Sequence, residues 1–162
     1  AEKDHPSFRQ GSAAFTRHLR QIPGLLDQVT AFYRGLFHSL GLDSEDMPQA
    51  LANEIYEQVV NLGQGGHTRY LQRICNAFNY SNKAGRPLFP DLAVDGALGP
   101  RTRAALRVLI EKRTTQAALV HALNAAQAMH YVNLAARDET QRCFLDGWLT
   151  RTHDPEAHGP AD

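Results

Sequence analysis

The sequence predicts an all-α fold. Apolar residues recur at the three- and four-residue spacing of an amphipathic helix, Gly and Pro stand where these stripes start and stop, and no segment alternates for the length of a strand. The 162 residues, 43% of them hydrophobic, are enough to bury a core. No apolar run reaches the roughly 20 residues that span a bilayer, so no membrane partner is expected.

Three amphipathic helices are predicted in the first half of the chain. The first covers residues 25–40 and ends at Gly41, and the second covers residues 46–62 and ends at Gly63. The third is expected to follow a break at Gly65-Gly66 and to bury a face that includes Leu71 and Cys75. The segment before Ile22 fits a helix only loosely.

The middle of the chain is predicted to be irregular. Residues 79–94 contain one Gly and two Pro and are expected to form a long loop. Asp95-Gly96 then forms a turn in which Gly96 supplies a positive φ.

Three helices are predicted after this turn. Gly99-Pro100 starts the first of them, and Thr114 or Thr115 caps a long Ala-rich helix. Asp138 followed by Gln141 has the pattern of a capping box and opens a last amphipathic helix through Trp148.

Composition argues against several classes of partner and site. Seventeen basic residues balance seventeen acidic ones, so no nucleic-acid partner is expected. Cys75 and Cys143 lie in apolar stripes and are expected to be buried thiols, although a disulfide between them is left open. No metal-binding or nucleotide-binding motif occurs, so no metal or cofactor is expected. Glu54 and Glu57 are three residues apart on a helix, and that spacing alone does not define a catalytic pair.

Four short motifs are more specific when taken in order. They are EQVVNLG at 57–63, the Leu71-Gln72 pair, VDGALGPRT at 94–102 and FLDGWLTR at 144–151. In this order they resemble glycoside hydrolase family 108, lysozyme-like N-acetylmuramidases that carry a type-three peptidoglycan-binding domain. The resemblance covers roughly residues 48–152.

The resemblance implies a lysozyme-like helical bundle directed at the glycan strand of peptidoglycan, in the periplasm or outside the cell. It implies one helical domain over 1–152, with 1–47 as a remnant of the lysozyme-like part and 48–152 as the peptidoglycan-binding part. Residues 153–162 are expected to form a disordered tail.

The family's E-G-G motif, whose Glu is the catalytic acid, is not found in this chain. Catalytic residues are therefore left unassigned, and hydrolysis would need a Glu from an N-terminal portion of the same protein. The interpretations kept open are the larger part of a wall-lytic effector or endolysin, a non-catalytic peptidoglycan-binding module, and a helical protein-interaction domain that retains the lytic fold.

The residues expected to bind the wall polymer are Glu57, Asn61, Gln72, Asp95, Thr102, Trp148 and Arg151. Asp95 and Thr102 also suit a turn and a helix start for purely structural reasons. Trp148 could stack on a sugar with Arg151 holding a carboxylate, but Trp148 also continues an apolar stripe and could pack in the core. Glu57 is expected to be a supporting polar group and not the acid.

Overall fold

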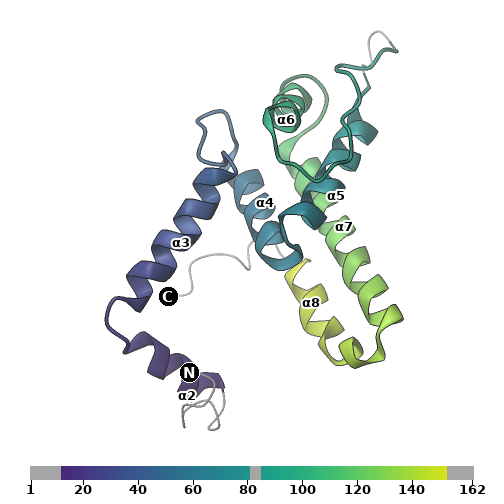
Figure 1. The fold of residues 1–162 in the computed structure, drawn as a ribbon. Helices are drawn as coiled ribbons and strands as arrows, with labels where there is room; N and C mark the ends of the chain where they lie inside the picture. The colour runs from purple at the N-terminus through teal and green to yellow at the C-terminus, as the bar shows by residue number, and fades with distance from the viewer. Residues whose placement is uncertain (1–11, 81–84, 153–162) are drawn as a thin grey trace. The chain divides into compact units, whose positions relative to one another are not determined.

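The computed structural model describes residues 12–80 and 85–152, and every regular element in these ranges is helical, which confirms the all-α prediction (Figure 1). The chain divides into two compact units, Ala1–Asp43 and Ser44–Asp162. The single helical domain expected over 1–152 stays a prediction, and the expected tail at 153–162 lies outside the described residues.

The first unit contains two helices, α2 (Ser12–Arg20) and α3 (Leu25–Ser39). Gly24 and Gly41 flank α3 with φ values of 73° and 64°, so glycines mark both of its ends. The segment that the sequence left ambiguous is helical at α2.

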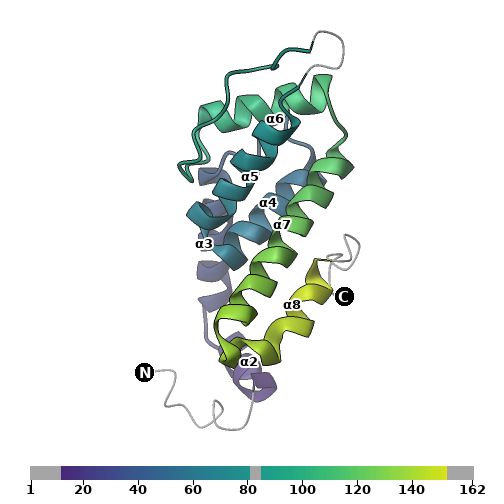
Figure 2. The same cartoon turned by 90° about the vertical axis from the view of Figure 1, so that its right-hand side faces the viewer.

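The second unit contains the remaining helices, namely α4 (Gln49–Leu62), α5 (Gln64–Phe78), α6 (Pro100–Lys112), α7 (Gln116–Arg137), the 3₁₀ helix η2 (Glu139–Phe144) and α8 (Leu145–Arg151). α4 packs on α5 and α7, and α5 also packs on α6 (Figure 2). Apolar residues four apart, such as Leu51 with Ile55 and Leu119 with Leu123, are fully buried between these helices.

The expected break at Gly65-Gly66 is wrong. The chain turns two residues earlier, at Gly63, which adopts φ 76° and ψ 148°, and α5 begins at Gln64. Both predicted break residues lie in the first turn of α5, where the backbone N–H groups need no partner within the helix and glycine is tolerated.

The last predicted helix is two elements. Asp138 accepts a hydrogen bond from the Thr140 N–H at 3.0 Å and caps η2, and α8 follows at Leu145. The capping box does not close, because the Asp138 N–H donates to the carbonyl oxygen of Leu134. Thr115 caps α7 by accepting from the Ala118 N–H at 3.2 Å.

The two cysteines differ. Cys75 is a buried free thiol, and burial raises the pKa of this thiol to about 12. Cys143 is free but exposed, so the expectation that it is buried is wrong. It lies in η2, whose three-residue turn takes it off the stripe that a continuous α-helix would have formed.

A chain of polar side chains runs through the core of the second unit. Gln58 Nε2 donates to Glu54 Oε1 at 2.6 Å, and the Gln58 Oε1 accepts from His67 Nδ1 at 3.0 Å. Because His67 is fully buried and its Nε2 has no partner among the described residues, its ring stays neutral. Burial lowers the pKa of His67 to about 4.

Stability is therefore expected to fall as the pH drops. The folded-state pKa of His67 lies below the unfolded value near 6.5, so below pH 6.5 the unfolded chain takes up a proton that the folded chain does not. The free energy of unfolding should fall by about 1.4 kcal/mol per pH unit between pH 6.5 and 4. Urea unfolding at a series of pH values measures this slope.

His67→Gln should flatten the slope, whereas a matched change at the exposed ring, His121→Gln, should keep it. The same slope in both variants would contradict the assignment to His67.

Candidate functional site

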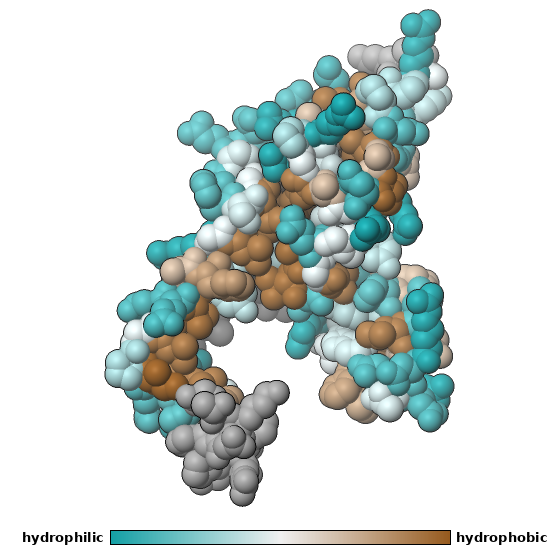
Figure 3. All heavy atoms as spheres, in the orientation of Figure 1, coloured by the Kyte–Doolittle hydropathy of each residue, from teal (hydrophilic) through white to brown (hydrophobic). Residues whose placement is uncertain are grey.

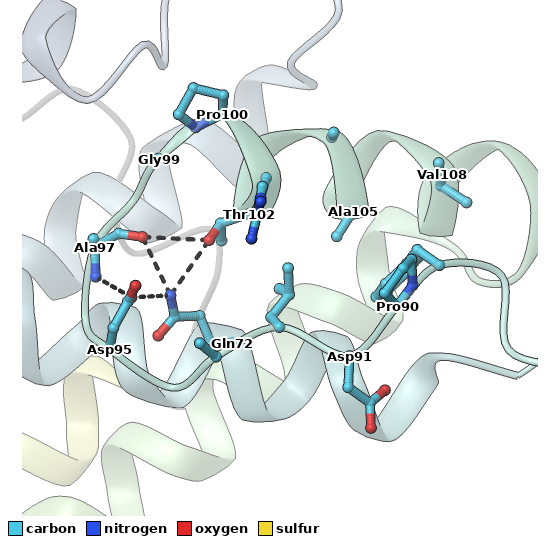
Figure 4. Close-up of a pocket in the computed structure, with 15 residues that line it drawn as sticks. Gln72, Pro90, Asp91, Asp95, Ala97, Gly99, Pro100, Thr102, Ala105 and Val108 are labelled. Carbon is cyan, nitrogen blue, oxygen red and sulfur yellow. Dashed lines mark hydrogen bonds between the residues drawn. The ribbon is translucent and has the colours of Figure 1, made fainter.

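A groove of about 830 Å³ lies between residues 85–99 and the first turns of α6 (Figure 4). Residues 85–99 belong to the segment between α5 and α6, and we call them the loop. Apolar side chains from the loop form one side of it, and Ala105 and Val108 of α6 form the other. Asp91, Asp95 and Arg101 add charged groups to the lining. In Figure 3, apolar side chains are visible among polar ones over this part of the second unit.

At one end of the groove, the side-chain amide of Gln72 is hydrogen-bonded to Asp95, Gly96 and Ala97. Its Nε2 donates to Asp95 Oδ1 at 2.7 Å and to the Ala97 carbonyl oxygen at 3.2 Å (Figure 4). Its Oε1 accepts from the Gly96 N–H at 2.9 Å. We call Gln72, Asp95 and Thr102 the turn lock. Both the Nε2 and the Oε1 of Gln72 are therefore hydrogen-bonded to the turn at residues 95–97.

Thr102 ties the turn lock to α6. Its hydroxyl donates to the Ala97 carbonyl oxygen at 3.3 Å and lies 3.4 Å from Gln72 Nε2. Gln72 and Thr102 are only 2% and 3% exposed. Three residues predicted as binding residues are therefore brought together, and two of them lie within the wall of the groove.

Asp95 is the accessible member of the turn lock. It accepts from the Ala97 N–H at 2.8 Å as well as from Gln72, and these two bonds hold the pKa of the Asp95 carboxyl below its usual value. Asp95 is therefore a carboxylate at neutral pH.

The neighbouring Gly96 has no room for a side chain. Its φ is 83°, and a Cβ would lie 2.9 Å from the Gly65 carbonyl oxygen and 3.1 Å from the Arg69 guanidinium. The predicted Asp-Gly turn is thus required by close approach to α5 as well as by its positive φ.

Two further side-chain amides, that of Asn76 in α5 and that of Asn79 directly after the end of α5, bind the backbone of the loop at residues 88–92. Asn76 exchanges hydrogen bonds of 2.8 and 2.9 Å with the backbone of Leu92. Asn79 donates to the Phe89 carbonyl oxygen at 2.7 Å and accepts from the Leu88 N–H at 2.8 Å. Sequence reasoning missed both, although amides at i, i+4 and i+7 on one helix face before a long loop are a readable signal.

The other predicted residues form a second group around Tyr131. Trp148 stacks on Tyr131 with a centroid distance of 5.1 Å, and it also stacks on the exposed ring of Phe144 at 5.8 Å. Burial raises the pKa of the Tyr131 phenol; Gln127 lowers it by donating a hydrogen bond, and the charges of Glu57 and Arg151 act on it in opposite directions.

Asn61 belongs to this group because its Nδ2 donates to Glu57 Oε1 at 3.2 Å. α6 lies beside the start of α7, and α8 lies beside its end (Figures 1 and 2). The seven predicted residues are thus divided between two ends of the second unit.

The two glutamates of α4 do not face each other across a cleft. Glu54 is 8% exposed and accepts from Gln58 and, at 3.4 Å, from Asn124 Nδ2. Glu57 belongs to the group around Tyr131. Neither lines the groove.

Residues 12–80 and 85–152 contain no group of three or more His, Cys, Asp or Glu side chains suited to a metal ion. Over the same ranges, no helix combines the length and the apolar character that crossing a membrane requires.

The second unit is thus an all-α unit with an open groove beside the Asp95-Gly96 turn. A family model described as "Predicted Peptidoglycan domain" matches residues 67–153, which are 87 of the 162 residues. The chain belongs to this family, and its function is directed at peptidoglycan. The matched segment contains the turn lock, the groove and α8. No curated protein matches the chain.

Removal of the Gln72 amide tests the turn lock. Gln72→Ala should lower the free energy of unfolding by about 2–4 kcal/mol, because it leaves the Gly96 N–H without its acceptor and opens a cavity. Urea denaturation measures the change. Gln64→Ala removes an exposed amide from the same helix and should change stability by less than about 0.5 kcal/mol. Equal losses in the two variants would contradict the role of Gln72.

Proposed function

We propose that this protein attaches to cell-wall peptidoglycan through the groove between the loop and α6. The observation that carries the proposal is the position of the groove: an open volume of about 830 Å³ lies inside the segment that matches the peptidoglycan family. Such a preformed concave site, mostly apolar with a few charged groups, suits a ligand that binds without large rearrangement. The expected location is the periplasm or the outside of the cell, where the polymer is found.

We further propose that Glu57, Asn61, Trp148 and Arg151 form a secondary contact surface for the wall. Phe144, 53% exposed, extends the aromatic stack of Trp148 at the surface. The charges of Glu57 and Arg151 lie near enough to act on the Tyr131 phenol beneath this stack. Aromatic rings next to charged groups suit a polymer with both sugar faces and carboxylates.

Blocking the groove tests the main proposal. Ala104 is exposed and lines the groove, so Ala104→Trp should fill part of it without entering the core. Co-sedimentation with purified sacculi is expected to show binding that falls at least about tenfold in this variant. The matched control, Ala125→Trp on an exposed position of α7, should bind like the unmodified protein.

Loss of binding in both tryptophan variants, or in neither, would contradict the assignment of the groove. A protein that never sediments with sacculi but captures a stoichiometric protein partner would favour the protein-interaction alternative.

A second candidate function is hydrolysis of the glycan strand, as in a muramidase lineage. The order of the motifs at 57–63, 71–72, 94–102 and 144–151 favours it. Hydrolysis by acid catalysis needs a protonated carboxyl at the scissile bond, with water or a carboxylate opposite. We propose that the catalytic Glu is supplied by an N-terminal portion of the same protein, because the E-G-G motif that holds this Glu in the family it resembles does not occur among the 162 residues.

The chain of residues 1–162 is therefore expected to release no reducing sugar ends from purified peptidoglycan while still binding it. The same assay on a form extended upstream by its encoding reading frame should show release. Hydrolysis by the 162-residue chain itself would contradict the proposal that the catalytic Glu lies upstream. Absence of hydrolysis by both forms would contradict the muramidase proposal.

A further inference from the structure

The chemistry of the groove indicates which part of peptidoglycan it receives. Peptidoglycan offers two kinds of ligand, a sugar strand covered with hydroxyl and acetamido groups and short peptide stems. The stems contain small apolar residues, free carboxylates and a diamino acid. We infer that the groove takes the peptide stem, with its carboxylate at Arg101 and its side-chain ammonium at Asp91 and Asp95. This inference rests on the proposed function.

Most of the residues that line the groove are apolar. Its lining includes Phe89, Pro90, Leu92, Ala93, Ala105 and Val108. Burying methyl groups of a peptide against such a surface is favourable, whereas burying sugar hydroxyls there without hydrogen-bond partners is costly. Among the described residues that line the groove, Phe89 is the one aromatic, so the lining offers no extended aromatic surface on which sugars could stack.

The polar groups of the inner wall are already engaged. The Gln72 amide makes its bonds to Asp95, Gly96 and Ala97, and the Thr102 hydroxyl donates to Ala97. The donor groups of Gln72 and Thr102 are thus used within the fold, and both side chains are buried, so they offer no free donor to a sugar oxygen. The Asp95 carboxylate is the polar group of this wall that stays exposed.

The charged groups of the lining come from the loop and from α6. Asp91 and Asp95 belong to the loop (Figure 4), and Asp91 Oδ1 accepts a hydrogen bond from Asn79 Nδ2 at 2.9 Å. Arg101 lies in the first turn of α6. All three charged residues are exposed, and in the described part of the chain no hydrogen bond or ion pair engages the Arg101 guanidinium. A guanidinium pairs well with a carboxylate, and two carboxylates attract an ammonium group. A zwitterionic stem complements this arrangement, whereas an uncharged stretch of sugars does not.

Separating the two parts of the polymer tests the inference. The probes are intact sacculi, glycan strands freed of peptide by an amidase, and the tetrapeptide L-Ala–γ-D-Glu–meso-diaminopimelate–D-Ala. The protein should sediment with intact sacculi and bind the peptide-free strands at least about tenfold less well. The free tetrapeptide should compete for sacculi.

Charge variants test the pairing at the groove. Arg101→Gln should weaken tetrapeptide binding by about tenfold, while Arg73→Gln, at an exposed position of α5 away from the lining, should leave it unchanged. Equal affinities of Arg101→Gln and the unmodified protein would overturn the carboxylate assignment.

These binding measurements distinguish a failure of the inference from a failure of the proposed function. Binding to intact sacculi and to peptide-free strands with equal affinity, without competition by the tetrapeptide, would overturn the inference and leave peptidoglycan attachment in place. Absence of binding to intact sacculi would overturn both.

Discussion

The groove depends on hydrogen bonds from one face of α5 to a loop that has no regular structure. A loop of this kind cannot pair its own backbone groups, and each unpaired group near the core costs free energy. Gln72, Asn76 and Asn79 supply the missing partners, with donor–acceptor distances mostly between 2.7 and 2.9 Å. Gln72 and Asn76 stand on α5 and Asn79 follows its last residue. Because α5 packs against α4, α6 and α7, these bonds fix the loop to the core of the second unit.

This arrangement connects stability with function. The bonds of the turn lock reach the start of α6 through Thr102, so the loop and α6 are fixed relative to each other before any ligand arrives. A preformed wall reduces the ordering cost of binding. Because the same bonds engage the donor groups of Gln72 and Thr102, a ligand can interact with the apolar lining and with the charges of Asp91, Asp95 and Arg101.

In this sequence, local patterns predict where most helices begin and end. They do not predict features that depend on one backbone angle or on contacts between residues far apart in the chain. The apolar stripes and end signals predict α3, α4, α6 and α7 well, because spacing, Gly and Pro act over a few residues. The start of α5 depends on the φ and ψ of Gly63, and the chain after the Asp138 cap begins as the 3₁₀ helix η2 before it continues as α8. The motifs singled out Gln72, Asp95 and Thr102, but their meeting across 23 and 30 residues requires the tertiary fold. For the same reason, the spacing of the motifs does not predict that these three residues lie apart from Trp148 and Arg151, which are at the other end of α7.

Hydrogen–deuterium exchange with and without soluble peptidoglycan fragments tests most directly whether the groove is the binding site. If the groove binds the polymer, exchange should slow at residues 88–97 and in the first turns of α6 when fragments are present, with α8 changing less. Protection confined to α8, or no protection in the loop and α6 despite saturating fragments, would contradict it.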